Sequence, residues 1–135
     1  GGNVTKIDLA TYEMSPIPSA GYTPRHVVLS PDDSVMYVTN NKSGTVRKIS
    51  TQTGELLGVV ATGREPRTMV MSPDGTALYV VNYLDDTLSK VRTSDMSVIQ
   101  TVPTGDRPIG VTFDAQTNRV WVANYSGSLL VFEDA

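Results

Sequence analysis

The 135-residue sequence contains no cysteine and a single histidine. Without cysteine there are no disulfide bonds, thiolate zinc sites or cysteine nucleophiles, and the redox environment of the protein stays open. One histidine cannot build a histidine-based zinc site, which needs about three protein ligands, and no HExxH or paired-histidine spacing is present. We therefore expect no bound metal ion and no cofactor held by this chain alone.

Charged residues and long apolar runs are also scarce. Charged residues make up 19% of the chain and apolar residues 39%, which is the balance of a globular domain rather than of a disordered polyelectrolyte. The net charge of −3 argues against a general binder of duplex DNA. No apolar run approaches roughly 18 residues and no charged-then-apolar leader is present, so we expect neither a membrane span nor a signal peptide in these residues.

The sequence repeats itself every 42 residues. Tyr37-Val-Thr-Asn40 recurs as Tyr79-Val-Val-Asn82 and as Trp121-Val-Ala-Asn124. A glycine and a proline recur upstream in the same register, as Gly21, Gly63 and Gly105 and as Pro24, Pro66 and Pro108. Each unit holds four short runs rich in Val, Ile, Tyr and Thr, separated by Gly, Pro, Asp and Ser, which is typical of antiparallel strands joined by tight turns. A four-stranded repeat of about 40 residues predicts a β-propeller blade.

The repeat predicts an all-β fold with an incomplete ring of about three blades. The chain is then one propeller segment with four parts: a partial blade at 1–21, two blades at 22–63 and 64–105, and a partial blade at 106–135. The strands of the first complete blade are expected at 25–29, 35–39, 45–49 and 56–61. The parts contribute two, four, four and three strands, so we expect 13 strands in all.

Propellers usually close from four to eight blades, so an arc of about three leaves apolar faces and strand edges exposed. One interpretation is a segment of a longer propeller or larger chain, with Gly1 and Gly2 marking an excision, a cleavage or a tag remnant. A second is assembly of two chains, whose 26 strands suffice for six blades with two to spare and whose ends share a composite blade. The third is an open, solenoid-like arc.

The repeat resembles a known family. Tyr37-Val-Thr-Asn40, the Pro24-Arg25 strand start, the Ser-Pro-Asp-Gly turn at 72–75 and Thr62-Gly63 before a proline together resemble the YVTN β-propeller repeat, over essentially the whole chain. The resemblance implies a propeller of bacterial or archaeal origin that is secreted, periplasmic or displayed on the cell surface. It implies no particular activity.

In propellers, the loops between fourth and first strands and between second and third strands emerge together around the central channel. We call this surface the channel face. Here it is rich in arginine and tyrosine, which is typical of interaction surfaces, and arginine suits carboxylates and phosphates. The candidate ligand-binding residues are Tyr22, Arg25, His26, Lys42, Arg64, Arg67, Tyr83, Asp85, Asp86, Arg107 and Tyr125. The competing interpretation is that these are solvated loop residues, some of them paired with neighbouring carboxylates.

The repeated asparagines and aromatic residues are expected to be structural, because a ligand site would normally be used once rather than in every blade. The asparagines end a strand, where their side chains can bond nearby backbone groups. The aromatic residues are expected in the core between blades. The two sets are Asn40, Asn82 and Asn124, and Tyr37, Tyr79 and Trp121.

The sequence holds no complete set of nucleophile, base or metal ligands, and no GxSxG elbow accompanies any serine, so we predict no catalytic residues. The predicted function is a non-enzymatic binding or scaffold module for a protein or a small anionic ligand. One alternative is the propeller portion of a quinoprotein or haem-d1-like oxidoreductase, with its cofactor ligands outside this segment. Another is single-stranded nucleic-acid binding through arginine and tyrosine loops.

Overall fold

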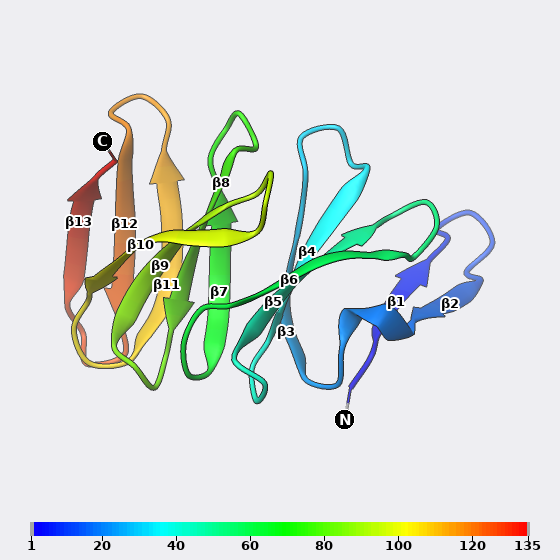
Figure 1. The fold of residues 1–135 in the computed structure, drawn as a ribbon, viewed down its shortest axis with the longest axis horizontal. Helices are drawn as coiled ribbons and strands as arrows, with labels where there is room; N and C mark the ends of the chain where they lie inside the picture. The colour runs from blue at the N-terminus through cyan, green and yellow to red at the C-terminus, as the bar shows by residue number, and fades with distance from the viewer. Residues whose placement is uncertain (1, 135) are drawn as a thin grey trace.

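The computed structural model describes residues 2–134, which form thirteen strands and one short 3-10 helix, η1 (Figure 1). These elements are β1 Val4–Ile7, β2 Met14–Ile17, η1 Pro18–Ala20, β3 Pro24–Leu29, β4 Val35–Asn40, β5 Thr45–Ser50, β6 Leu56–Ala61, β7 Pro66–Met71, β8 Ala77–Asn82, β9 Thr87–Arg92, β10 Ser97–Pro103, β11 Pro108–Asp114, β12 Arg119–Asn124 and β13 Leu129–Glu133. No helix in this part of the chain is long and apolar enough to cross a membrane.

The strands form four antiparallel sheets, each made of strands consecutive in sequence. We call them the first blade (β1–β2), the second blade (β3–β6), the third blade (β7–β10) and the fourth blade (β11–β13). Figure 1 shows the sheets side by side, with the first and fourth blades at opposite ends of the molecule. The predicted all-β fold of four-stranded antiparallel blades in an incomplete ring is confirmed.

The hydrophobic core lies between the blades rather than inside any one of them, because a single sheet has no interior of its own. One cluster joins the second and third blades around Tyr37 and Leu78. Another joins the third and fourth blades around Tyr79 and Val122. A smaller one, around Ile49, joins the first and second blades. Each blade is therefore stable only against its neighbours.

The expected burial of the repeated aromatic residues is confirmed for two of them and wrong for the third. Tyr37 and Tyr79 are each 3% exposed, whereas Trp121 is 39% exposed. Side chains alternate along β12, so that Val120 and Val122 pack against the third blade while Trp121 points to the other face. No described residue covers that face of the fourth blade.

The Ser-Pro-Asp turns connect the first two strands of the second and third blades. In the third blade, the Asp74 carboxylate accepts hydrogen bonds from the hydroxyls of Ser72 and Thr76 and from the Thr76 amide. These bonds lower the pKa of Asp74 from 3.8 to about 2. The expected local bonding of these turn aspartates is thereby confirmed.

Asparagine side chains at the ends of β4 and β8 hold the loop that leads into their own blade. The Asn40 amide donates to the Ala20 carbonyl over 2.6 Å, and the Asn82 amide donates to the Thr62 carbonyl over 3.3 Å. Both asparagines are at most 1% exposed, and the Asn82 amide also donates to the Ser89 hydroxyl. The structural role predicted for the repeated asparagines is confirmed at these two positions.

The glycine of each repeat exists because its asparagine lies against it. A Cβ atom on Gly21 would lie 2.3 Å from Asn40 Oδ1, and one on Gly63 would lie 2.8 Å from Asn82 Cγ. The backbone of Gly63 does not need left-handed dihedral angles, so the close approach alone excludes a side chain there. The shared 42-residue spacing of glycine and asparagine therefore records one contact made in every unit.

This contact predicts the effect of one methyl group. Gly63→Ala should lower the free energy of unfolding by about 1–3 kcal/mol, because buried Asn82 cannot move without losing its hydrogen bonds. Gly110→Ala is the matched control, since its Cβ would meet only Ala123 Cβ at 3.5 Å, an ordinary contact. Urea denaturation of both variants measures the difference. Equal stability of the two variants would contradict the prediction.

Candidate functional site on the channel face

The loops of the channel face are tied to each other within each blade. The Tyr83 amide donates to the Glu65 carbonyl over 2.9 Å, and the Leu84 amide donates to the Arg64 carbonyl over 3.2 Å. The second blade has the equivalent bond from Asn41 to Thr23, and the fourth has the bond from Tyr125 to Arg107. The structure thus brings the two predicted sets of loops together in three consecutive blades.

Two aspartates in the loop after β8 fix two of the arginines. Asp85 accepts a hydrogen bond from the Arg64 amide over 2.8 Å and pairs with Arg64 Nε at 2.5 Å. Asp86 accepts from the Arg107 amide over 2.8 Å, and its carboxylate lies 3.6 Å from Arg107 Nη1. The Arg64 hydrogen bonds hold the pKa of the Asp85 carboxyl below its usual value. Both arginines therefore have a carboxylate partner.

Arg67 is held differently, by an aromatic ring. Its guanidinium carbon lies 3.8 Å from the centre of the Tyr83 ring, and that of Arg107 lies 5.5 Å from the same centre. Its Nε atom is buried and has no hydrogen-bond partner among the described residues. The Arg67 carbonyl accepts from the Thr39 hydroxyl over 2.8 Å, which anchors its backbone to the second blade. Arg67 is thus a fixed cation whose buried donor is unused.

The remaining predicted residues lie outside this cluster. Tyr22 and Tyr125 are 85% and 72% exposed, and Arg25 and Lys42 are also exposed. His26 is half-buried on β3, and burial lowers the pKa of its imidazole below 6.5, so the ring is neutral at pH 7. The cluster formed in the third blade and its neighbour consists of Arg64, Arg67, Tyr83, Asp85, Asp86 and Arg107. The binding role of all these residues stays a prediction.

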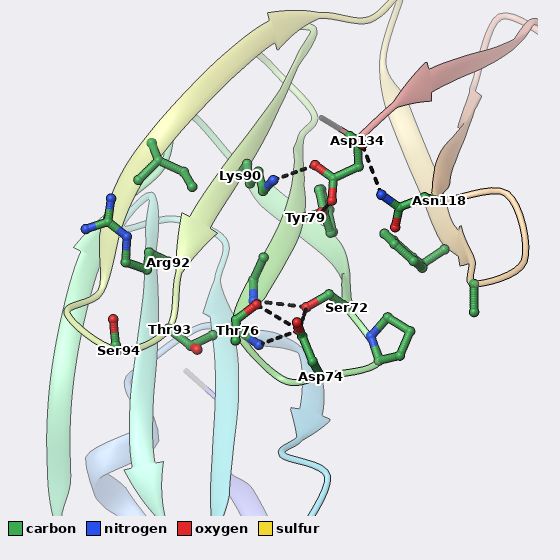
Figure 2. A pocket seen from close by; sticks show the side chains of 15 residues that line it. Ser72, Asp74, Thr76, Tyr79, Lys90, Arg92, Thr93, Ser94, Asn118 and Asp134 are labelled. Carbon is green, nitrogen blue, oxygen red and sulfur yellow. Dashed lines mark hydrogen bonds and ion pairs between the residues drawn. The ribbon is translucent and has the colours of Figure 1, made fainter.

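A second polar site, missed from the sequence, lies between the third and fourth blades at the opposite end of the strands. Figure 2 shows Asp134 facing Lys90 and Tyr79 at a cavity of about 670 Å³. The Tyr79 hydroxyl donates to Asp134 over 2.5 Å, and Lys90 forms a largely buried ion pair with the same carboxylate. Burial and the adjacent Asp134 raise the pKa of Tyr79. Burial alone would raise the pKa of Asp134, but its bonds to Lys90 and Tyr79 outweigh burial and lower it.

The same contact occurs one blade earlier in a neutral form. Lys48, which is 42 residues before Lys90, donates to the Thr93 carbonyl over 2.9 Å. The 42-residue spacing of Lys6, Lys48 and Lys90 is the sequence signal that could have identified this contact. Within residues 2–134, no group of three or more histidine and carboxylate side chains is placed to hold a metal ion.

Comparison with known proteins supports the fold and leaves the function open. No protein-family model and no curated protein matches the chain. Among solved structures, hydrazine synthase from Kuenenia stuttgartiensis is 27% identical over 82% of this chain and 32% of its own, with a TM-score of 0.78. Dihydro-heme d1 dehydrogenase NirN is 22% identical over 98% of this chain and 33% of its own, with a TM-score of 0.74. The WD40 repeats of RRP9 are 20% identical over 84% and 40%, with a TM-score of 0.67.

These structure neighbours are β-propeller proteins, and they include enzymes as well as WD40 repeats. The chain spans between a third and a half of the length of the solved structures it matches. It is therefore a β-propeller segment by fold.

The pairing of Asp85 with Arg64 predicts a pH response. Because the carboxyl pKa is lowered in the folded protein, the contact is complete at neutral pH and is lost only as pH falls through that lowered pKa. The NMR signal of the Arg64 amide should titrate with a midpoint below 3.8, and Asp85→Asn should abolish this titration. A midpoint at or above 3.8 would show that the pair does not form in solution.

Proposed function

We propose that the chain is part of a non-enzymatic binding module that holds an anionic group of its ligand, a carboxylate or phosphate, on the channel face at Arg67. One observation carries this proposal. Arg67 is stacked on Tyr83 and has a buried Nε without a partner, whereas the neighbouring arginines are paired with aspartates.

Stacking and pairing leave Arg67 in different chemical situations from Arg64 and Arg107. A guanidinium stacked on an aromatic ring is held in one plane by its face, and its N–H donors stay free to bind along its edge. A buried donor without a partner costs roughly 1–3 kcal/mol, which a bound anion can recover. Two donors in one plane match the geometry of a carboxylate or phosphate.

The surrounding loops support binding without reorganisation. Tyr83 is fixed through its backbone to Glu65, and Asp86 is bonded to the Arg107 amide of the next blade. A preorganised site loses little conformational entropy when its ligand binds. We include in the proposal the membership of the YVTN repeat family and the extracytoplasmic location, which rest on the sequence motifs.

A redox protein is the second candidate. Two of the solved neighbours are named as hydrazine synthase and dihydro-heme d1 dehydrogenase. Within this chain the supporting observation is His26, whose half-buried neutral imidazole has the protonation state of an axial haem ligand. The proposal in this form requires further cofactor ligands outside the segment.

The anion site predicts that inorganic phosphate binds to the protein and that Arg67→Gln weakens this binding at least about tenfold. Isothermal titration at low ionic strength measures the affinity. Arg92→Gln is the matched control, because Arg92 is exposed, lies outside the channel face and pairs with Asp95. Equal loss in both variants would reveal unspecific charge attraction and contradict the proposal, as would unchanged affinity of the Arg67 variant.

The redox candidate predicts a coloured complex. Adding haem to the purified protein should give a visible absorption band that shifts from that of free haem, and His26→Ala should remove the shift because the axial nitrogen is lost. Val27→Ala, on the same strand, should leave it unchanged. A band that the His26 variant retains would exclude this residue as the ligand.

A further inference from the structure

The fourth blade has a free strand edge and an uncovered apolar face. Among the described residues, β13 pairs with β12 on one side and with no strand on the other. Trp121 and Val131, which are register partners on β12 and β13, are 39% and 44% exposed, and Leu129 is 67% exposed. An edge of this kind is a template for pairing with another strand.

The cavity in Figure 2 is the place that a methionine fills one blade earlier. Met96 is 8% exposed and packs in the cluster around Tyr37, three residues after Thr93. In the next unit, Asp134 stands at the position of Thr93, and the cavity of about 670 Å³ lies beside it, lined by Tyr79. The cavity therefore fits the turn that precedes a fourth strand and the side chain that this turn buries.

The N-terminal hairpin of the chain carries such a turn and such a strand. Tyr12 stands 84 residues before Met96, at the same repeat position, and both have left-handed backbones, with φ of 60° and 52°. Tyr12 is 77% exposed, however, and Met14 at the start of β2 is 69% exposed. Strand β2 is held only in a two-stranded sheet with β1, and isolated two-stranded ribbons are marginally stable.

The exposed face of the second blade complements the exposed face of the fourth. Val27 and Leu29 on β3 are 43% and 48% exposed. Leu29 has the repeat position of Phe113, whose ring lies 5.6 Å from that of Tyr79 across a blade boundary. Trp121 has the repeat position of Tyr79, so it is the side chain that would cover Leu29 across an equivalent boundary.

We propose that a second copy of this chain completes the fourth blade by donating its β2 to the edge of β13, with its Tyr12 in the cavity. Its η1 and β3 then follow as the connection into the next blade, so Val27 and Leu29 of the second copy cover Trp121. Each chain contributes twelve of its thirteen strands and leaves β1 outside. Two chains supply 24 strands, which is six blades, within the usual range for closed propellers.

The register identifies a pair of residues for cross-linking. Ser97 is opposite Arg92 in the third blade, and the equivalent pair in the composite blade is Glu13 of one copy opposite Glu133 of the other. Both glutamates are exposed, and their blades lie at opposite ends of one chain in Figure 1, so a disulfide between them must be intermolecular. The chain has no native cysteine to compete.

The test combines mass and cross-linking. Light scattering of the full chain should give 29 kDa, twice 14.5 kDa, and Trp121→Ser should weaken the dimer at least about tenfold while circular dichroism stays unchanged. Under mild oxidation, Glu13→Cys with Glu133→Cys should form a covalent dimer. The matched control is Glu55→Cys with Glu133→Cys, since Glu55 has the position of Glu13 in a blade that is already complete.

The opposite outcomes are equally definite. A monomer at about 100 µM, or equal cross-linking of the test and control pairs, overturns the proposal. A monomer that binds an added peptide spanning 93–104, the turn and fourth strand of the third blade, also overturns it and assigns the free edge to another polypeptide. None of these measurements involves Arg67, so they are independent of the proposed anion site.

Discussion

The approach of one asparagine to one glycine in each unit sets the geometry on which the rest of the structure depends. Asn82 reaches the backbone at Thr62 only because Gly63 has no side chain, and this fixes where the chain enters its blade. The loops of the channel face start from that point. Because the contact recurs every 42 residues, successive blades present their loops in equivalent positions.

Against this regular background, the third blade differs in its charges. The repeat places Arg25, Arg67 and Ile109 at equivalent positions, but only Arg67 has a tyrosine ring beneath its guanidinium. The pair Asp85 and Asp86 occurs in this blade alone and fixes the arginines on either side. A repetitive scaffold therefore acquires a single distinctive site through a few loop substitutions, without any change to its strands.

The sequence could predict the strands and their grouping, because hydrophobic alternation and turn residues are local and are repeated three times. It could not predict the exposure of Trp121, since burial at that position depends on whether a neighbouring blade is present. It predicted local bonds for Asn82, whereas the side chain reaches Thr62, 20 residues upstream. The ion pair of Lys90 with Asp134 was missed because it joins different blades and replaces a neutral contact in the unit before it.

Within the chain, the strand ladders run inside the blades, and side chains make the connections between them. The Thr39 hydroxyl binds the Arg67 carbonyl over 2.8 Å, and the Thr68 hydroxyl binds the Ile109 carbonyl over 2.7 Å. An arrangement of this kind behaves as a one-dimensional array, in which each unit is stabilised by its nearest neighbours. Thermal opening then starts at the outer blades and proceeds inward. The third blade, which has a core cluster on both sides, is the last to lose its structure, and it is the blade that carries Arg67.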